Sequence, residues 1–395
     1  MKALMLEEII DDISTLLPKV KHLISLMKSS RNPMVFTGAG ISTSAGVPDY
    51  RSSYKTLLKT GPGVWESEEN RQKFDRIPII KPAIETCPTK THMALKTLLD
   101  AGFISHIITQ NVDNLHLKSG INDENLIELH GNICKEYCEK CRTIFYRDFY
   151  VKPPKISDPL EVYTSRNCHY CQGKLRKTLV NFGEKVPEEK IMKSYELIKK
   201  SDLCLCFGTS FRVNPAGKIP KMFTKENGKK LGIVNLQKTF FEENADAVIH
   251  GFCDDVFEVI MRELGLTIDE FHIKKTVVVE FVKEKDGVRM KVQGKIPGNV
   301  QKDYYNLQEI EVLDLTNKEF FKRKAEEDIM EVTFKKNLKD VRICVKFFGN
   351  SLEPNAELTV NLNEKVWAGD TLKLGYDLKL DDFLKEWSIN QYNIH

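Results

Sequence analysis

The sequence predicts an α/β fold with a doubly wound parallel sheet, a small inserted cysteine-containing module and an all-β C-terminal domain. Short apolar segments at 33–38, 104–111, 203–210 and 230–236 alternate with amphipathic stretches such as 91–102 and 186–201. That alternation is typical of parallel sheets covered by helices on both faces. From Thr276 onward, apolar and polar residues alternate in short runs separated by turn residues, which predicts antiparallel strands.

The composition is that of a globular protein with room for more than one domain. The chain has 395 residues, of which 41% are hydrophobic and 29% charged, and its formal net charge is +3. No apolar run approaches the length of a membrane span, so no membrane partner is expected. The small net charge gives no indication of direct nucleic-acid binding. These properties predict an ordinary soluble globular protein.

The expected location is intracellular, and the expected division of the chain is into three parts. Acidic and apolar residues at helical spacing near the N-terminus do not match a secretory signal. Ten cysteines in such a chain indicate thiols or metal rather than disulfides. The predicted parts are an N-terminal helical segment at 1–30, an α/β domain at 31–268 with the cysteine module at about 132–176, and a β-rich domain at 273–395.

A glycine-rich turn follows the first predicted strand, in the segment FTGAGISTSAGVPDYRS at 36–52. Gly38, Ala39 and Gly40 match the tight turn of a nucleotide-binding βα unit. The complete dinucleotide fingerprint is absent, because Thr43 stands in place of its third glycine. The acidic residue that a dehydrogenase places about twenty positions further on could only be Glu66, in a segment that is poorly strand-like. The turn therefore predicts a nucleotide site and disfavours a hydride-transferring dehydrogenase.

Small or polar residues stand at the end of each of the four predicted parallel strands. Because ligands of such sheets bind beyond the carboxyl ends of the strands, these clusters are expected to converge on one site. The four clusters are Thr37-Gly38, Thr109-Gln110-Asn111, Gly208-Thr209-Ser210 and Asn235-Leu236-Gln237.

Two Cys-x-x-Cys pairs predict a metal site. Cys138 and Cys141 are separated from Cys168 and Cys171 by 26 residues, which suits a four-thiolate zinc site of the ribbon type. Four thiolates leave no coordination position for water, so the zinc is expected to be structural. Cys134 is a possible competitor, but the paired spacing favours the other four.

A histidine in the segment ELHGN is the candidate general base. His130 directly precedes the cysteine module and follows the polar segment TQNVDNLH, and an imidazole with a near-neutral pKa is the usual base for a hydroxyl proton. His116 is the rival candidate. Its place in an amphipathic run favours a packing role.

Taken in order, these motifs resemble the sirtuin family of NAD-dependent protein deacylases. The resemblance extends from Arg31 to Leu266, about three-fifths of the chain, and is carried by GAGISTSAGVPDYR, TQNVDNLH, ELHGN, the cysteine pairs, FGTS and IVNLQ. The segments THMAL, VDNLHLKSG and CEKCRTIFYRDF are most similar to the branch that contains human sirtuins six and seven, which is associated with chromatin.

The resemblance implies site residues position by position. The glycine-rich turn would cradle the NAD pyrophosphate through backbone N–H groups, and residues 46–51 would close over the nicotinamide ribose. The implied catalytic residues are His130, as the base, and Asn111. The implied NAD-binding residues are Gly38, Ala39, Gly40, Thr43, Asp49, Tyr50, Arg51, Trp65, Gln110, Asn111, Asp113, His130, Gly208, Thr209, Ser210, Asn235, Leu236, Gln237 and Cys253.

The implied reaction is group transfer, in which the acyl group of a protein lysine moves to ADP-ribose and nicotinamide leaves. It uses NAD as co-substrate and one structural zinc per chain. The expected partners are acyl-lysine proteins or peptides, with histone tails foremost, and the expected location is the nucleus, with the cytoplasm as the alternative. Two other functions stay open: a protein mono-ADP-ribosyltransferase, and a catalytically weak zinc-bearing chromatin-binding module. The presence of both Asn111 and His130 favours the deacylase.

Three features depart from the family pattern. Ser52 replaces the glycine that usually follows the loop arginine, and about eight extra residues near SSYKTLLKT precede Trp65. Asn114 stands where the related branch has glycine. The C-terminal part resembles no family. Its alternating runs, with a hairpin signal at Asp286-Gly287, predict a small β-sandwich or barrel of about 120 residues.

Overall fold

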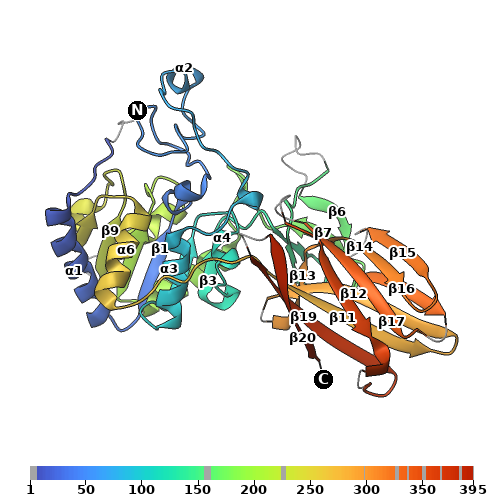
Figure 1. Ribbon diagram of the computed structural model, residues 1–395. Helices are drawn as coiled ribbons and strands as arrows, with labels where there is room; N and C mark the ends of the chain where they lie inside the picture. The colour runs from blue at the N-terminus through green and yellow to red at the C-terminus, as the bar shows by residue number, and fades with distance from the viewer. Residues whose placement is uncertain are drawn as a thin grey trace. The chain divides into compact units, whose positions relative to one another are not determined.

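The computed structural model describes residues 7–154, 162–223, 228–297, 299–324, 329–335, 338–348, 353–364, 367–381 and 385–394. Contacts divide the chain into two compact units (Figure 1). The first consists of Met1–Asn132 and Leu179–Phe271, and the second of Ile133–Thr178 and His272–His395. The segment with the cysteine pairs therefore shares its contacts with the C-terminal part of the chain. Each unit is described below by itself.

The first unit contains the predicted parallel sheet, with six strands in the order β10-β9-β8-β1-β2-β3. Every neighbouring pair is parallel. The chain order runs outward in both directions from β1, so β1 and β8 form the switch point at which ligands of doubly wound sheets bind. The strands are β1 (Pro33–Thr37), β2 (His106–Thr109), β3 (Leu126–Glu128), β8 (Leu203–Phe207), β9 (Lys230–Val234) and β10 (Ala247–Ile249).

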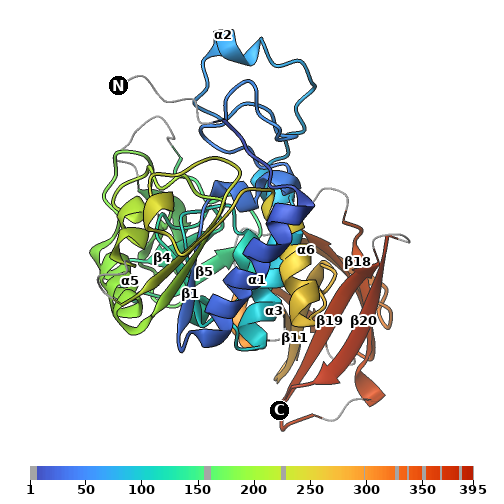
Figure 2. The ribbon, with the colours of Figure 1, turned by 90° about the vertical axis from the view of Figure 1, so that its left-hand side faces the viewer.

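Helices cover both faces of this sheet, which confirms the doubly wound class. Alternate residues of β1 enter different cores: Val35 packs with residues of α1, α3 and α6, whereas Met34 and Phe36 pack with Ile198 of α5. Figure 2 shows α5 on the opposite side of β1 from α1, α3 and α6. The helices are α1 (Ile13–Ser29), α2 (Glu68–Arg71), α3 (Lys90–Asp100), α4 (Leu115–Lys118), α5 (Glu188–Lys200) and α6 (Cys253–Leu264).

Side-chain caps fix where two of these helices begin. Asp12 accepts a hydrogen bond from the Thr15 N–H (2.8 Å) at the start of α1. Thr89 and His92 form a reciprocal capping box at the start of α3. Within the described part of the chain, no helix has both the length and the apolarity that crossing a membrane requires.

The second unit is made of β-strands in two sheets, and most of the neighbouring strands pair antiparallel. One has ten strands, nine of them in the order β20-β19-β11-β12-β13-β5-β4-β7-β6, with β16 also paired to β12, and the other has four in the order β15-β14-β17-β18. The strands are β4 (Lys135–Cys138), β5 (Ile144–Arg147), β6 (Tyr163–Asn167), β7 (Lys174–Lys177), β11 (Lys274–Glu284), β12 (Gly287–Ile296), β13 (Asn299–Tyr305), β14 (Leu307–Asp314), β15 (Glu319–Lys324), β16 (Met330–Lys335), β17 (Asp340–Phe347), β18 (Ala356–Asn361), β19 (Thr371–Asp381) and β20 (Glu386–Asn393).

Both sheets contribute to one hydrophobic core, so this part of the chain is a β-sandwich. Buried residues alternate with exposed ones along β18, where Ala356, Leu358 and Val360 belong to this core. The predicted hairpin is present, since β11 and β12 pair antiparallel from Thr276 opposite Lys295 to Glu284 opposite Gly287.

A single parallel pairing joins the cysteine module to this sandwich. Tyr304 and Tyr305 of β13 lie opposite Tyr146 and Arg147 of β5. Because β4 and β7 continue the sheet beyond β5, the module and the C-terminal strands form one ten-stranded sheet. Local sequence patterns gave no signal for this pairing between residues that lie far apart in the chain.

Candidate active site and zinc centre

The glycine turns after β1 and β8 pack directly against each other. The Gly40 N–H donates to the Gly208 carbonyl (2.9 Å), and the Gly38 N–H donates to Phe207 (3.1 Å). A Cβ added at Gly38 would lie 2.7 Å from the Gly208 oxygen, and one at Gly40 would lie 2.7 Å from the Gly208 Cα. Gly208 itself has a φ of 60°. Glycine is therefore required here, because a side chain at any of these positions would collide with the backbone of the facing turn.

A hydrogen-bonded group ties the first glycine turn to the loop after β2. Asn111 Nδ2 donates to the Gly38 carbonyl (3.0 Å) and to Ser42 Oγ (3.2 Å). Ser42 Oγ donates in turn to Asp113 Oδ2 (2.6 Å). Both Ser42 and Asp113 are buried. Ser42 was missed by the sequence analysis, although it lies within the glycine-rich segment. This group fixes the plane of the Asn111 amide.

His130 lies beside the loop after β2, and a hydrogen bond to that loop selects one tautomer of its imidazole. Its Nδ1 is 3.0 Å from the carbonyl of Gln110, and a carbonyl can only accept, so Nδ1 carries the proton. Gln110 also donates from Nε2 to Thr209 Oγ1 (2.8 Å). Burial lowers the pKa of His130, and Lys190 lowers it further, against the opposing effect of Gln110. The neutral ring then has its lone pair on Nε2, which is the form a general base needs.

His116, the rival histidine, is a core residue. Its Nε2 is 3.0 Å from Thr37 Oγ1, and its ring contacts that of His92 at 4.9 Å between centroids. Burial lowers the pKa of both rings to about 3, so both are neutral at physiological pH. This placement favours the packing role over a catalytic one.

The segment at 49–52 pairs with residues 63–65. Ser52, one of the departures from the family pattern, donates its hydroxyl to Asp49 Oδ2 (2.7 Å) and its N–H to Oδ1 (3.1 Å). Burial raises the pKa of Asp49. The Arg51 guanidinium lies over the Trp65 ring at 4.4 Å, and burial lowers the pKa of Arg51.

An aromatic cluster stands on this segment. The rings of Tyr50, Trp65 and Phe182 contact one another at centroid distances of 4.7–5.4 Å. Phe182 and Trp65 are exposed. Because Phe182 comes from the segment before α5, the cluster joins two segments that lie far apart in the chain.

The remaining predicted site residues follow the carboxyl ends of β1, β8, β9 and β10. Asn235 is buried and its Nδ2 donates to the Gln237 carbonyl (2.8 Å). Cys253 begins α6 as a buried thiol, whose pKa burial raises to about 12. Thr43 is buried, and its hydroxyl donates to the Gly40 carbonyl (3.1 Å). The structure thus groups the predicted residues at the carboxyl edge of one sheet. The others in this region are Ala39, Ser210 and Leu236.

Asn114, another departure from the pattern, occupies a position that favours glycine. Its φ is 71°, in the left-handed region that asparagine tolerates better than most residues. Its Oδ1 accepts from Asn132 Nδ2 (2.9 Å). The substitution therefore preserves the turn.

The four predicted cysteines come together in one cluster in the second unit. One Sγ atom from each of Cys138, Cys141, Cys168 and Cys171 lies within 4.8 Å of every other. Arg142 and Gln172 close the two knuckles at φ values of 62° and 58°. Four convergent thiols fit a tetrahedral zinc ion, and a closed four-thiolate shell makes that zinc structural. Cys134 is buried but is not a member of the cluster.

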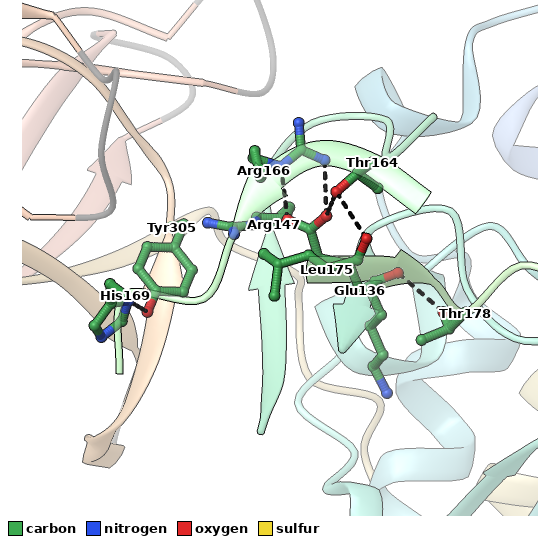
Figure 3. A network of polar contacts seen from close by, with 9 residues as sticks. Glu136, Arg147, Thr164, Arg166, His169, Leu175, Thr178 and Tyr305 are labelled. Carbon is green, nitrogen blue, oxygen red and sulfur yellow. Dashed lines mark hydrogen bonds and ion pairs between the residues drawn. The ribbon is translucent and has the colours of Figure 1, made fainter. Parts of the chain in front are cut away.

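Beside the cluster, a buried ionic network joins β4, β5 and β6 (Figure 3). Glu136 is fully buried and accepts from Arg147 Nε (2.7 Å) and Arg166 Nε (2.7 Å). The Arg147 guanidinium lies 4.1 Å from the ring centroid of Tyr305 on β13. The Tyr305 hydroxyl is 3.2 Å from Nδ1 of His169, which lies between two of the cysteines. Strand β13 of the C-terminal part thus contributes to the packing of the zinc module.

Comparison with known proteins identifies relatives of this chain. The Sir2 family model matches residues 38–215. SRT1 of Arabidopsis thaliana, an NAD-dependent protein deacetylase, is 38% identical over 267 residues, which are 67% of this chain and 53% of SRT1. The chain thus spans about half the length of this plant relative.

In two further comparisons, the match covers a larger share of the related protein. A solved structure described as "Sir2-p53 peptide-NAD+" is 29% identical, with a TM-score of 0.46, and the match covers 63% of this chain and 99% of that one. The NAD-dependent protein deacetylase Sirt6 of Drosophila melanogaster is 34% identical over 274 residues, which are 67% of this chain and 81% of Sirt6. This chain belongs to the Sir2 family, the sirtuins.

Proposed function

We propose that this chain is an NAD-dependent protein-lysine deacylase, which removes acetyl or longer acyl groups. The carrying observation is that the loop after β2 joins Asn111, which donates to the glycine turn after β1, to His130, which is held by the Gln110 carbonyl, in a member of the Sir2 family. The names of SRT1 and Sirt6, both NAD-dependent protein deacetylases, support the proposal.

The residues at the carboxyl edge of the sheet fit NAD. Gly38, Gly40 and Gly208 allow the turns after β1 and β8 to pack closely at the switch point of the sheet, and the pyrophosphate is proposed to bind beside these turns. Arg51 supplies a positive charge on the adjacent segment. Bound NAD would supply a ribose carbon with nicotinamide as its leaving group, and the acyl group would end on ADP-ribose.

His130 is proposed as the general base. Nδ1 is held by the Gln110 carbonyl, so Nε2 is the atom that would accept a proton from a ribose hydroxyl. Asn111 would orient the nicotinamide end through an amide fixed by Gly38 and Ser42. The zinc would hold the module together without entering the reaction.

The peptide is proposed to lie between residues 182–184 and 211–214, as an added strand. Histone tails are the first substrates to test, and the nucleus is the proposed location, because segments such as THMAL and CEKCRTIFYRDF resemble the chromatin-associated branch of the family. Both statements rest on that similarity.

One experiment separates the proposed functions. The protein is incubated with NAD and with acetylated or long-chain acylated histone peptides, and the products are identified by mass. Free lysine peptide together with O-acyl-ADP-ribose is the expected result. ADP-ribose attached to protein would instead identify a transferase, and unconsumed NAD would contradict catalysis altogether.

A further inference from the structure

The extra residues before Trp65 form the tip of a closed loop. The Gly63 N–H donates to Ser52 (2.8 Å), Val64 to Asp49 (2.8 Å) and Trp65 to Tyr50 (3.0 Å). Residues 49–52 and 63–65 are therefore the two arms of one hairpin-like loop, and residues 53–62 are its tip. The segment proposed to close over NAD is one of these arms.

The tip is fastened by a glutamate from the N-terminal segment. Glu8 Oε1 accepts from Thr56 Oγ1 (2.7 Å), and Oε2 accepts from the Leu57 N–H (2.6 Å). Both carboxylate oxygens are thus used on neighbouring residues of the tip. Thr56 is 1% exposed, so its hydroxyl needs this partner. Hydrogen bonds to an ionised carboxylate are stronger than neutral ones.

The same N-terminal segment is attached to the carboxyl ends of β9 and β10. Glu8 forms an antiparallel bridge with Gln237, and the Ile9 N–H donates to the Leu236 carbonyl (2.8 Å). Three residues further on, the Asp11 N–H donates to the His250 carbonyl (2.9 Å), and Asp11 Oδ2 accepts from the His250 N–H (2.8 Å). Three hydrogen bonds thus fix residues 8–11 beside the proposed adenosine end of the site.

We propose that Glu8 is a positioning residue that ties the tip of the 49–65 loop to the end of β9 and so holds the loop ready to bind NAD. This inference rests on the proposed function. Without Glu8, the inserted residues would lengthen a loop that must be ordered for NAD to bind, and the ordering would weaken the observed affinity. Glu8 touches neither the proposed base nor Asn111, so its effect is expected on NAD binding rather than on the acyl-transfer step.

The test compares the full chain with its Glu8→Ala variant by two measurements. Calorimetric titration with NAD should show the dissociation constant rising about three- to tenfold in the variant. Hydrogen exchange of the free protein should show the Leu57 amide exchanging faster, since its acceptor has been removed. Glu8→Gln retains one acceptor oxygen and should lie between the two. Glu7→Ala is the matched control, because Glu7 is the exposed neighbouring acid.

Unchanged NAD affinity in Glu8→Ala would overturn the inference. If that variant fails to fold, Thr56→Val removes the partner hydroxyl from the other side at nearly equal volume, and the same rise in the dissociation constant is expected. Failure of the proposed function is distinguishable, because it would appear in the wild-type chain as absence of NAD binding or of deacylated peptide, whereas failure of this inference would appear only in the variants. Faster exchange at Leu57 without any change in affinity would show an anchor that does not act on the cofactor, and would also overturn the inference.

Discussion

A single backbone carbonyl decides what His130 can do. The Gln110 oxygen holds the proton on Nδ1, which leaves Nε2 as the only basic atom of the ring. The loop that supplies this carbonyl also supplies Asn111 and Asp113, and Ser42 fastens it to the glycine turn. The orientation of the proposed catalytic residues therefore depends on hydrogen bonds between neighbouring loops.

His130→Ala is expected to reduce the deacylation rate constant by at least about 100-fold, the usual contribution of a general base. The fold and NAD binding should be retained, because His130 is only half-buried and belongs to no apolar core. Activity is measured by peptide mass, and NAD binding by calorimetry. His22→Ala, which removes an exposed imidazole from α1, is the control. Turnover of His130→Ala within tenfold of wild type would exclude its role as the base.

The pH dependence of the wild-type rate follows from the same residue. Deacylation needs the neutral imidazole, and burial places the pKa of His130 below its usual value of 6.5. The rate should therefore persist below pH 6.5 and fall only as the pH drops through this lowered pKa. A plot of kcat/KM against pH measures the acidic limb. A midpoint above 6.5 would contradict the burial argument.

At the scale of elements, local patterns predicted the sheet well and the long-range pairings poorly. Buried strands such as β1 and β8 are continuous apolar runs with polar residues at their carboxyl ends. The sequence therefore predicted both the strands and the edge of the sheet at which the site lies. The four cysteines could be grouped because knuckle spacing is a local property. The bridge from Glu8 to Gln237 and the pairing of β13 with β5 depend on tertiary packing, which no local pattern encodes.

The ionic network of the zinc module provides a test at this scale. Arg147→Met should destabilise the module by about 3 kcal/mol, because a buried ion pair loses one partner while Glu136 keeps Arg166. Arg176→Met is the matched control: its pair with Glu139 is solvent-exposed, and about 1 kcal/mol or less is expected. Thermal unfolding and the rate of zinc release to a chromophoric chelator measure both variants. Equal unfolding temperatures and equal rates of zinc release in the two variants would show that the buried network does not stabilise the module more than an exposed ion pair does.

At the scale of the whole molecule, the zinc module belongs by its contacts to the C-terminal part of the chain. Lys275 is buried and forms ion pairs with Asp148 of the module and with Glu353 (3.2 Å). Tyr305 covers Arg147 and contacts Phe145 at 5.5 Å between centroids. The proposed NAD residues, by contrast, all lie in the first unit. Zinc retention and NAD binding are therefore expected to respond differently to loss of the C-terminal strands.

A chain ending at Phe271 should retain NAD binding and lose zinc faster than the full chain. This truncation removes β13, so Arg147 and Phe145 would be uncovered. It also removes Lys275, so the buried Asp148 would lose its ion-pair partner. Because structural four-thiolate zinc supplies on the order of 10 kcal/mol of folding free energy, the module should unfold as the metal leaves. Calorimetry with NAD and metal analysis after chelator treatment give the two readouts. Tyr305→Ala in the full chain is a milder version and should accelerate zinc loss in the same direction. Zinc retention equal to that of the full chain in both variants would mean that the module is stable by itself and that the β-sandwich serves another purpose.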